Sequence, residues 1–270
     1  MTELLTTVEA SRLAGVGPTA IKRWADDGRL HCVKTAGGHR RFRRTELEAL
    51  LRSGAGSDAR PDRWDDWFDA LLDQEGQFRT EARLLTERAD AGSWAEVASR
   101  IGGLLTEIGE RWARGSLTIT EEHVMSERLR RAVARIAEAL PVSSDAPVCL
   151  LAAAEGDPHT GGLWLSELTL RECGWRALWA GAPMPATELA AAVARWKPRL
   201  VAVSASRLSK PSTLGREAAS LAKACRRAGA VLVLGGHGRW PAVRDARRLE
   251  TFPGFAALLR ELRTERVARS

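Results

Sequence analysis

The chain has 270 residues, of which 44% are hydrophobic and 28% charged, which is the composition of a folded protein with room for two or three cores. It lacks a signal-peptide layout, and no apolar run approaches the roughly 20 residues that are needed to cross a bilayer. Its four cysteines form no Cys-x-x-Cys pair. We therefore expect a cytoplasmic protein without membrane contact. Its formal net charge of +7 favours a polyanionic partner.

The first segment predicts two short helices joined by a glycine turn. An N-capping threonine opens a helix over Thr7–Ala14, Gly15-Val16-Gly17 forms the turn, and Pro18 suits the first turn of a second helix that reaches Asp26. Such a pair is a helix-turn-helix, whose second helix enters the major groove of double-stranded DNA. The outward residues that we expect to contact base edges are Thr19, Lys22 and Arg23.

A basic β-hairpin is predicted next. Residues 28–33 and 39–42 have strand patterns around a glycine turn at 35–38, and the stretch from Lys34 to Arg44 holds five basic residues and no acidic one. A third helix is expected to open with a capping box formed by Thr45 and Glu48. The hairpin is the wing of a winged helix, which contacts phosphates. Its expected DNA-binding residues are His39, Arg40, Arg41 and Arg43.

These cations have an alternative interpretation as an ordinary solvated surface, but they coincide with both DNA-contacting elements of the fold, which favours DNA binding. The module resembles the winged helix-turn-helix of MerR-type regulators, most clearly in Gly37-Gly-His-Arg-Arg-Phe42. We therefore predict a DNA-binding domain over residues 1–52, followed by a Gly/Ser/Pro linker at 53–61.

Residues 62–142 predict a four-helix bundle. Apolar residues recur at helical spacing, and breaks near Gly76, Gly92 and Gly115 divide the segment into four helices. The residues expected to face the core include Leu85 on the second helix and Val124 on the fourth.

Residues 146–270 predict an α/β domain. Apolar strands alternate with helices, which is typical of a parallel sheet covered on both faces, a doubly wound Rossmann-like fold. The chain as a whole is thus expected to be multidomain, α followed by α/β. The predicted strands are 148–154, 177–180, 200–204 and 231–234, and the predicted helices are 163–173, 186–196, 214–228 and one from Gly254.

Polar and glycine residues stand at three of these strand ends. Asp157-x-His159-x-x-Gly162 follows the first strand, Ser204 ends the third, and Gly235-Gly236 follows the fourth. A histidine in such a loop is more often a solvated or capping residue, but the combination at matching strand ends favours one ligand site. Neither a Gly-x-Gly-x-x-Gly motif nor a Walker motif is present, so a dinucleotide or nucleoside triphosphate is not expected.

This spacing resembles the cobalamin-binding domain of methionine synthases and cobalamin-dependent mutases. The resemblance implies that His159 is the lower ligand of cobalt, that Asp157 fixes its tautomer, and that the nucleotide tail of the cofactor lies beside Gly162, Ser204 and the Gly235-Gly236 pair. One departure affects the tail contacts: the family usually has an apolar residue two places after the serine, where this chain has Ser206.

A second resemblance lies in the bundle, where Trp112 is followed after nine residues by Glu122-His123. Alone, Trp112 would be assigned to core packing and Glu122-His123 to a polar helix start. The spacing resembles the cap of CarH/LitR light-responsive repressors, in which the tryptophan packs on the adenosyl group of adenosylcobalamin and the other two line the upper pocket. In that family a histidine follows the tryptophan and captures cobalt after photolysis, whereas this chain has Ala113. Either His123 replaces it, or water does, or light is not the signal.

The order of the three modules resembles CarH/LitR along nearly the whole chain. It implies a transcriptional repressor that is not an enzyme and that binds a double-stranded DNA operator. In the dark, adenosylcobalamin would hold the protomers together as an assembly of two to four, and light would take this assembly apart. Three alternatives stay open: a sensor of cobalamin level, a regulator that holds a bilin instead, and a corrinoid methyl carrier. The helix-turn-helix and the lack of a partner catalytic domain argue against the last.

Overall fold

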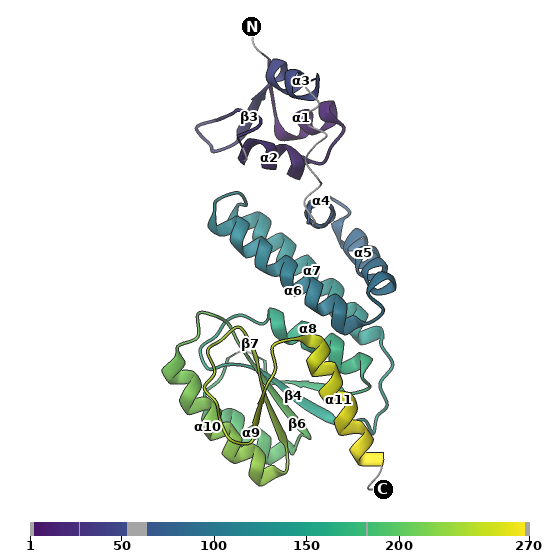
Figure 1. Cartoon of the computed structure of the whole chain (residues 1–270), viewed down its shortest axis with the longest axis vertical. Coiled ribbons are helices and arrows are strands. Elements are labelled where there is room, and N and C mark those ends of the chain that lie inside the picture. Colours follow the sequence, from purple (N-terminus) through teal and green to yellow (C-terminus); the bar gives the residue numbers. More distant parts are fainter. Residues whose placement is uncertain (1–2, 27, 53–63, 182, 268–270) are drawn as a thin grey trace. The chain divides into compact units, whose positions relative to one another are not determined.

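A computed structural model describes residues 3–26, 28–52, 64–181 and 183–267 (Figure 1). The predicted linker at 53–61 lies outside the described residues. The chain divides into two compact units: Met1–Arg83 with Thr106–Leu129, and Leu84–Leu105 with Arg130–Ser270. The helical segment is therefore shared by both units, because three of its helices run from one into the other.

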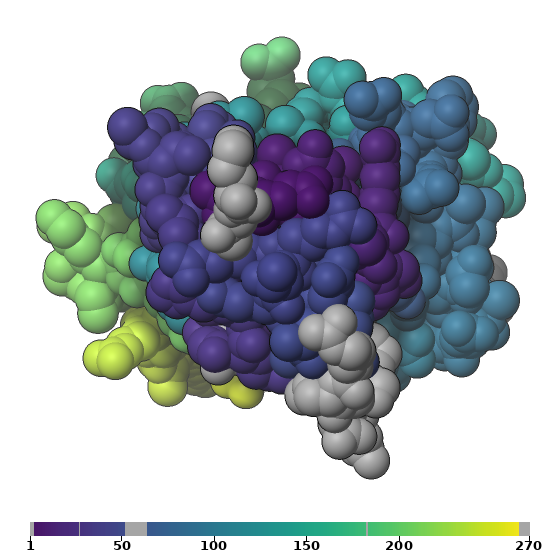
Figure 2. All heavy atoms as spheres, turned by 90° about the horizontal axis from the view of Figure 1, so that it is seen from above, coloured from purple at the N-terminus to yellow at the C-terminus, as the bar shows by residue number. Residues whose placement is uncertain are grey.

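The N-terminal module is a winged helix-turn-helix. The bounds of its elements are β1 Leu4–Leu5, α1 Thr7–Ala14, α2 Pro18–Asp26, β2 Cys32–Lys34, β3 Arg40–Arg43 and α3 Arg44–Arg52. The strands form an antiparallel sheet in the order β1-β3-β2, in which Cys32 pairs with Phe42. Ile21, Trp24 and Phe42 are buried in its core, and Figure 2 shows the module as a purple-to-indigo surface.

Two capping predictions for this module are wrong. The N-cap of α1 is Thr6 rather than Thr7, because Thr6 and Glu9 form a reciprocal capping box. Helix α3 begins at Arg44, so Thr45 lies inside the helix, and the Glu48 carboxylate pairs with Arg44 instead.

The four helices predicted for the middle of the chain are present. Their bounds are α4 Asp65–Leu72, α5 Gly76–Ala91, α6 Trp94–Ala113 and α7 Ile119–Ala139. Gly92 and Gly115 have φ angles of 77° and 73°, and this left-handed conformation, which favours glycine, ends α5 and α6. Leu85 and Val124, predicted to face the core, are 56% and 37% exposed.

The C-terminal domain is a parallel sheet with helices on both faces. The bounds of its elements are β4 Val148–Ala153, α8 Gly161–Glu172, β5 Arg176–Trp179, α9 Ala186–Trp196, β6 Leu200–Ala205, α10 Pro211–Ala228, β7 Val231–Gly236, β8 Ala246–Arg248 and α11 Phe252–Val267. The strands lie in the order β5-β4-β6-β7-β8. Helices α8 and α11 pack on one face and α9 and α10 on the other, while alternate β4 residues such as Leu151 and Leu150 point to opposite faces (Figure 1).

The topology of this sheet indicates where a ligand would bind. From β4 the chain crosses to β5 on one side and then to β6 on the other, so the direction of winding reverses between β4 and β6. At such a switch point the loops after neighbouring strands separate and leave a crevice at the carboxyl ends of the strands. No helix among the described residues is long and apolar enough to span a lipid bilayer.

Candidate functional site

A histidine lies in the loop after β4, at this switch point. The His159 backbone N–H donates to Asp157 Oδ1 over 3.0 Å, and ring atom Nδ1 lies 2.9 Å from the same oxygen. The Asp157 side chain is 1% exposed and the His159 side chain 54%. A buried carboxylate thus orients an imidazole whose other edge faces outward.

The other oxygen of Asp157 is fully engaged as well. Oδ2 accepts hydrogen bonds of 2.5 Å from the Ser206 backbone N–H and from the Ser209 hydroxyl. Burial by itself would raise the pKa of Asp157, but the hydrogen bonds from Ser209, Ser206 and His159 outweigh it and hold this pKa well below its usual value.

The ionised state of Asp157 determines the His159 tautomer. An ionised carboxylate only accepts hydrogen bonds, so Nδ1 donates, and Nε2 is left as the ring nitrogen that can offer a lone pair. Within the described part of the chain, Nε2 makes no hydrogen bond. A neutral imidazole held in this way through its other nitrogen is the usual form of a metal-ligating histidine.

Ser204, near the end of β6, lies against two bare glycine backbones. A Cβ added to Gly162 would lie 2.8 Å from Ser204 Oγ, and one added to Gly236 would lie 2.9 Å from that oxygen and 2.3 Å from the Ala205 carbonyl oxygen. Gly236 also has a φ of 77°, which disfavours other residues. The predicted residues Gly162, Ser204 and Gly236 therefore converge into one closely packed group, which we call the cradle.

Two other predicted residues have different roles. A Cβ on Gly235 would meet nothing nearer than 3.8 Å, so sterics do not demand glycine there. The Ser206 hydroxyl accepts from the Leu208 backbone N–H, and the Ser206 backbone N–H holds Asp157. Sequence reasoning missed Ser209, which anchors Asp157, although a hydroxyl soon after the β6 end was a usable signal.

A buried carboxyl lies beneath the same loop. Glu217 on α10 is 1% exposed, and it accepts the backbone N–H of Glu155 over 3.0 Å. Burial, with the nearby charges of Glu155 and Asp157, raises the pKa of Glu217 to about 7 despite that hydrogen bond. No sequence motif had indicated this buried carboxyl.

The predicted cap residues lie in the first compact unit, whereas His159 and the cradle lie in the second. Trp112, near the end of α6, is 49% exposed. In the first turn of α7, Glu122 Oε2 lies 2.5 Å from His123 Nδ1, and Glu122 Oε1 accepts from the Ser126 hydroxyl over 2.7 Å. The His123 side chain is 70% exposed. An indole and an imidazole are thus available for contact near the α6–α7 turn.

The predicted DNA-contacting residues separate into two groups. In the wing, His39 and Arg43 are exposed and Arg41 is half-buried. Arg40 is largely covered, because it pairs with Asp26 over 2.8 Å and donates to the Lys22 carbonyl oxygen over 3.0 Å.

The prediction that Thr19, Lys22 and Arg23 point outward is wrong. Thr19 is 7% exposed, and its hydroxyl donates to Asp69 over 2.9 Å. Lys22 and Arg23 are half-buried and form ion pairs with acidic residues of the helical segment. These side chains are covered because the outer face of α2 packs on other helices of its own unit.

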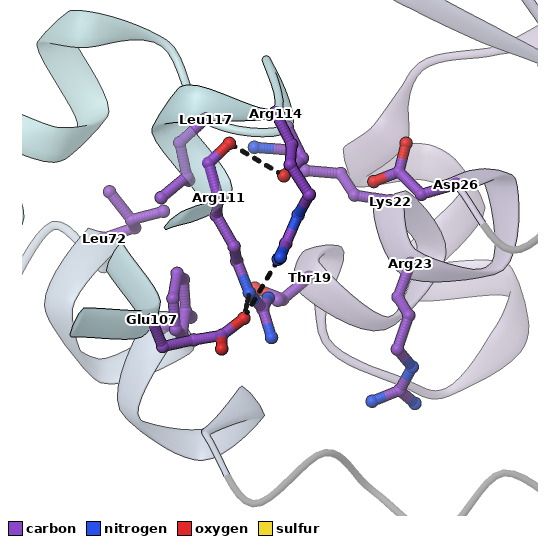
Figure 3. Close-up of a pocket in the computed structure, with 11 residues that line it drawn as sticks. Thr19, Lys22, Arg23, Asp26, Leu72, Glu107, Arg111, Arg114 and Leu117 are labelled. Atoms are coloured by element: carbon purple, nitrogen blue, oxygen red, sulfur yellow. Dashed lines mark hydrogen bonds and ion pairs between the residues drawn. The ribbon is translucent and has the colours of Figure 1, made fainter. Parts of the chain in front are cut away.

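A cavity of about 500 Å³ lies beside α2 in the first unit (Figure 3). Thr19, Lys22 and Arg23 approach it from α2, and Glu107, Arg111 and Arg114 approach it from α6 and the turn that follows. Arg111 Nε donates to Glu107 over 2.7 Å, and the Arg111 guanidinium lies 4.1 Å from the centre of the Phe68 ring.

Comparison with known proteins supports the helix-turn-helix and a similarity to known repressors. A family model described as a helix-turn-helix domain matches residues 4–55. The chain is 33% identical over 122 residues to the HTH-type transcriptional repressor CarA of Myxococcus xanthus, covering 45% of this chain and 41% of the relative. It is 30% identical over 165 residues to the repressor CarH of the same organism, covering 58% and 54%. The predicted resemblance to CarH-type regulators is confirmed. The chain spans about half the length of these curated relatives.

The CarH-type resemblance is joined by a likeness of fold. The structure matches the monomethylamine corrinoid protein of Methanosarcina barkeri with a TM-score of 0.51 and 18% identity, over 72% of this chain and 95% of that chain. At this level of identity the match shows a common fold, and it agrees with the predicted helical and Rossmann-like architecture.

Proposed function

We propose that this protein is a DNA-binding transcriptional repressor controlled by a corrinoid, adenosylcobalamin, bound at His159. The observation that carries the proposal is the pairing of an ionised, buried Asp157 with a half-exposed imidazole whose Nε2 is unengaged. The relatives named repressors and the corrinoid-protein fold support it.

The residues of the α/β domain fit such a cofactor. His159 presents one nitrogen lone pair, which suits a single axial ligand to cobalt. The cradle of Gly162, Ser204 and Gly236 has no room for side-chain carbon and suits a nucleotide tail that threads close to the backbone. Asp157 keeps His159 in the ligating tautomer.

The other side of the cofactor would be contacted by Trp112, Glu122 and His123. An indole face suits a nucleoside base, because stacking buries apolar area without a fixed hydrogen-bond pattern. When bound, adenosylcobalamin supplies a cobalt–carbon bond that visible light cleaves. We propose that the loss of the adenosyl group leaves Trp112 without its stacking partner and so weakens an assembly of two to four protomers.

DNA binding is assigned to the winged helix. The wing residues His39, Arg41 and Arg43 would contact phosphates, and Thr19, Lys22 and Arg23 on α2 would contact base edges. An assembly that links several such modules raises affinity without any new contact, because the second binding event becomes intramolecular.

Light and cofactor level are two candidate signals, and Ala113 favours the second, because the residue that follows the tryptophan carries no imidazole. Size-exclusion chromatography and gel shifts with adenosylcobalamin, in the dark and after green light, separate them. Dissociation and DNA release after illumination support the light sensor, and equal assembly and DNA retention support the level sensor.

An absorption spectrum of the purified protein distinguishes a corrinoid from a bilin. An assay of methyl transfer from a donor tests the alternative of a corrinoid methyl carrier.

A further inference from the structure

The three α2 residues expected to read DNA each contact an acidic side chain of the same compact unit. Lys22 Nζ lies 2.6 Å from Glu121 Oε1 at the start of α7. The Arg23 guanidinium pairs with the Asp65 carboxylate on α4, and the Thr19 hydroxyl donates to Asp69 on the same helix. The acidic partners thus occupy the hydrogen-bonding positions that phosphates and base edges would need.

The contact also includes the backbone of the helix-turn-helix. A Cβ added to Gly17, in the turn before α2, would lie 1.8 Å from Asp69 Oδ2 and 2.7 Å from Asp69 Cγ. The turn and the first part of α2 therefore lie directly against α4. A DNA duplex, whose major groove is only about 12 Å wide, requires the recognition helix to be free of such a neighbour.

The acidic partners are held in place by further contacts. Glu121 Oε2 accepts the backbone N–H and the hydroxyl of Thr118, which form the N-terminal cap of α7. The Arg23 and Asp65 side chains are 17% and 9% exposed, so their ion pair is well shielded from water. Charge pairs of this kind are screened by salt much less than surface ion pairs.

We infer that α4 and the start of α7 form an intramolecular docking surface, defined by Asp65, Asp69 and Glu121, which blocks the recognition helix until α2 separates from it. This inference rests on the proposed function, in that α2 must be the element that enters DNA. Only undocked molecules bind, so the apparent affinity falls in proportion to the undocked fraction.

The docking surface is close in sequence to the proposed cofactor cap. Glu121 directly precedes Glu122-His123, and Arg111, which lines the cavity beside α2, directly precedes Trp112 (Figure 3). The same turns of α6 and α7 thus carry the residues of the proposed cap and residues that contact α2 or line the cavity beside it. This places the block where cofactor binding can change it.

The first test neutralises the docking surface in the full-length chain. Asp65→Asn with Glu121→Gln removes two charges that face α2. The matched control, Asp66→Asn with Glu110→Gln, removes two exposed charges from α4 and α6, where the parent side chains are 73% and 55% exposed. Fluorescence anisotropy with a random-sequence 30-base-pair duplex, at about 50 mM salt, measures the affinity. We expect the docking variant to bind roughly tenfold more tightly than the control, which is about 1.4 kcal/mol. Equal affinities would overturn the inference.

The second test locks the docked state and does not depend on the charge variants. Gly17→Cys with Asp69→Cys places two thiols at a pair of positions close enough for a disulfide. The oxidised protein is expected to bind the duplex at least tenfold more weakly than the same protein after reduction, with oxidised Asp69→Cys alone as the control. Unchanged binding after oxidation, or no disulfide at all, contradicts the block. If no form binds DNA, including the charge-neutralised and reduced ones, the proposed DNA binding itself fails.

Discussion

Asp157 Oδ1 lies 2.9 Å from His159 Nδ1 and 3.0 Å from the His159 backbone nitrogen, so one buried oxygen fixes both the ring and the main chain of the candidate cobalt ligand. The two contacts leave the imidazole a single nitrogen for a metal. The proposed ligation of cobalt by His159 depends on this pair more than on any other contact.

Asp157→Asn is expected to weaken cobalamin binding roughly 10- to 100-fold, the usual effect of removing the carboxylate behind a metal-ligating histidine. An amide cannot accept as many hydrogen bonds from Ser206, Ser209 and His159, so the ring loses its fixed tautomer. His237→Ala serves as the comparison, since His237 lies in the loop after β7. Cofactor retained after desalting, read from the absorption spectrum, gives the result. Equal retention by the two variants would show that Asp157 does not support the ligand.

Gly236→Ala is expected to destabilise the α/β domain by about 1–3 kcal/mol, because an alanine must adopt a φ of 77° with its Cβ 2.3 Å from a carbonyl oxygen. Gly235→Ala is the matched control in the adjacent position, where a Cβ meets only ordinary contacts, and its effect is expected within about 0.5 kcal/mol. Urea unfolding measures both. If the two variants have the same free energy of unfolding, Gly236 is not closely packed in the cradle, and the prediction is wrong.

Trp112→Ala is expected to leave stability nearly unchanged, because the side chain is 49% exposed, and to abolish assembly driven by adenosylcobalamin. Trp196→Ala removes an indole that is also 49% exposed, from a helix outside the cap, and is expected to assemble normally. Size-exclusion chromatography with cofactor in the dark compares them. Normal assembly of the Trp112 variant rejects its role as the cap.

The Glu217 carboxyl predicts a pH dependence of stability. Its pKa is raised from 4.5 to about 7. The stabilisation that the protonated carboxyl contributes to the free energy of unfolding is therefore fully present below pH 4.5 and is lost as the pH rises through 7. Glu217→Gln, which keeps a neutral side chain, is expected to melt above the wild type at pH 8 and close to it at pH 5. Glu188→Gln, at an exposed position of α9, controls for the lost charge. If the melting temperature of Glu217→Gln differs from that of the wild type by the same amount at pH 5 and pH 8, Glu217 does not titrate between these pH values, and the prediction is wrong.

Much of the fold was predictable because its signals are local. The apolar runs that became β4, β6 and β7 are buried on both faces and therefore lack polar residues, and glycines mark the ends of α5 and α6. The short strands β1 and β8 were missed, since two or three residues carry too little pattern. Their pairing with β3 and β7 depends on the rest of the sheet.

The candidate site was predictable where side chains follow strand ends, as for His159, Ser204 and Gly236. It was not predictable where contacts join distant segments. Ser209 reaches Asp157 across 52 positions, and Arg23 reaches Asp65 across 42. Helical spacing showed that Thr19, Lys22 and Arg23 share the outer face of α2, but it could not show that another helix covers that face.

The most direct test of the central claim is electron paramagnetic resonance of the protein loaded with reduced, Co(II) cobalamin. A nitrogen bound below cobalt splits the signal, and uniform ¹⁵N labelling of the protein changes that splitting only if the nitrogen belongs to the protein. We predict triplet splitting with unlabelled protein, doublet splitting with labelled protein, and loss of this label dependence in His159→Gln. Triplet splitting that persists in the labelled wild type would show that the cofactor's own base holds the metal, and would contradict the account.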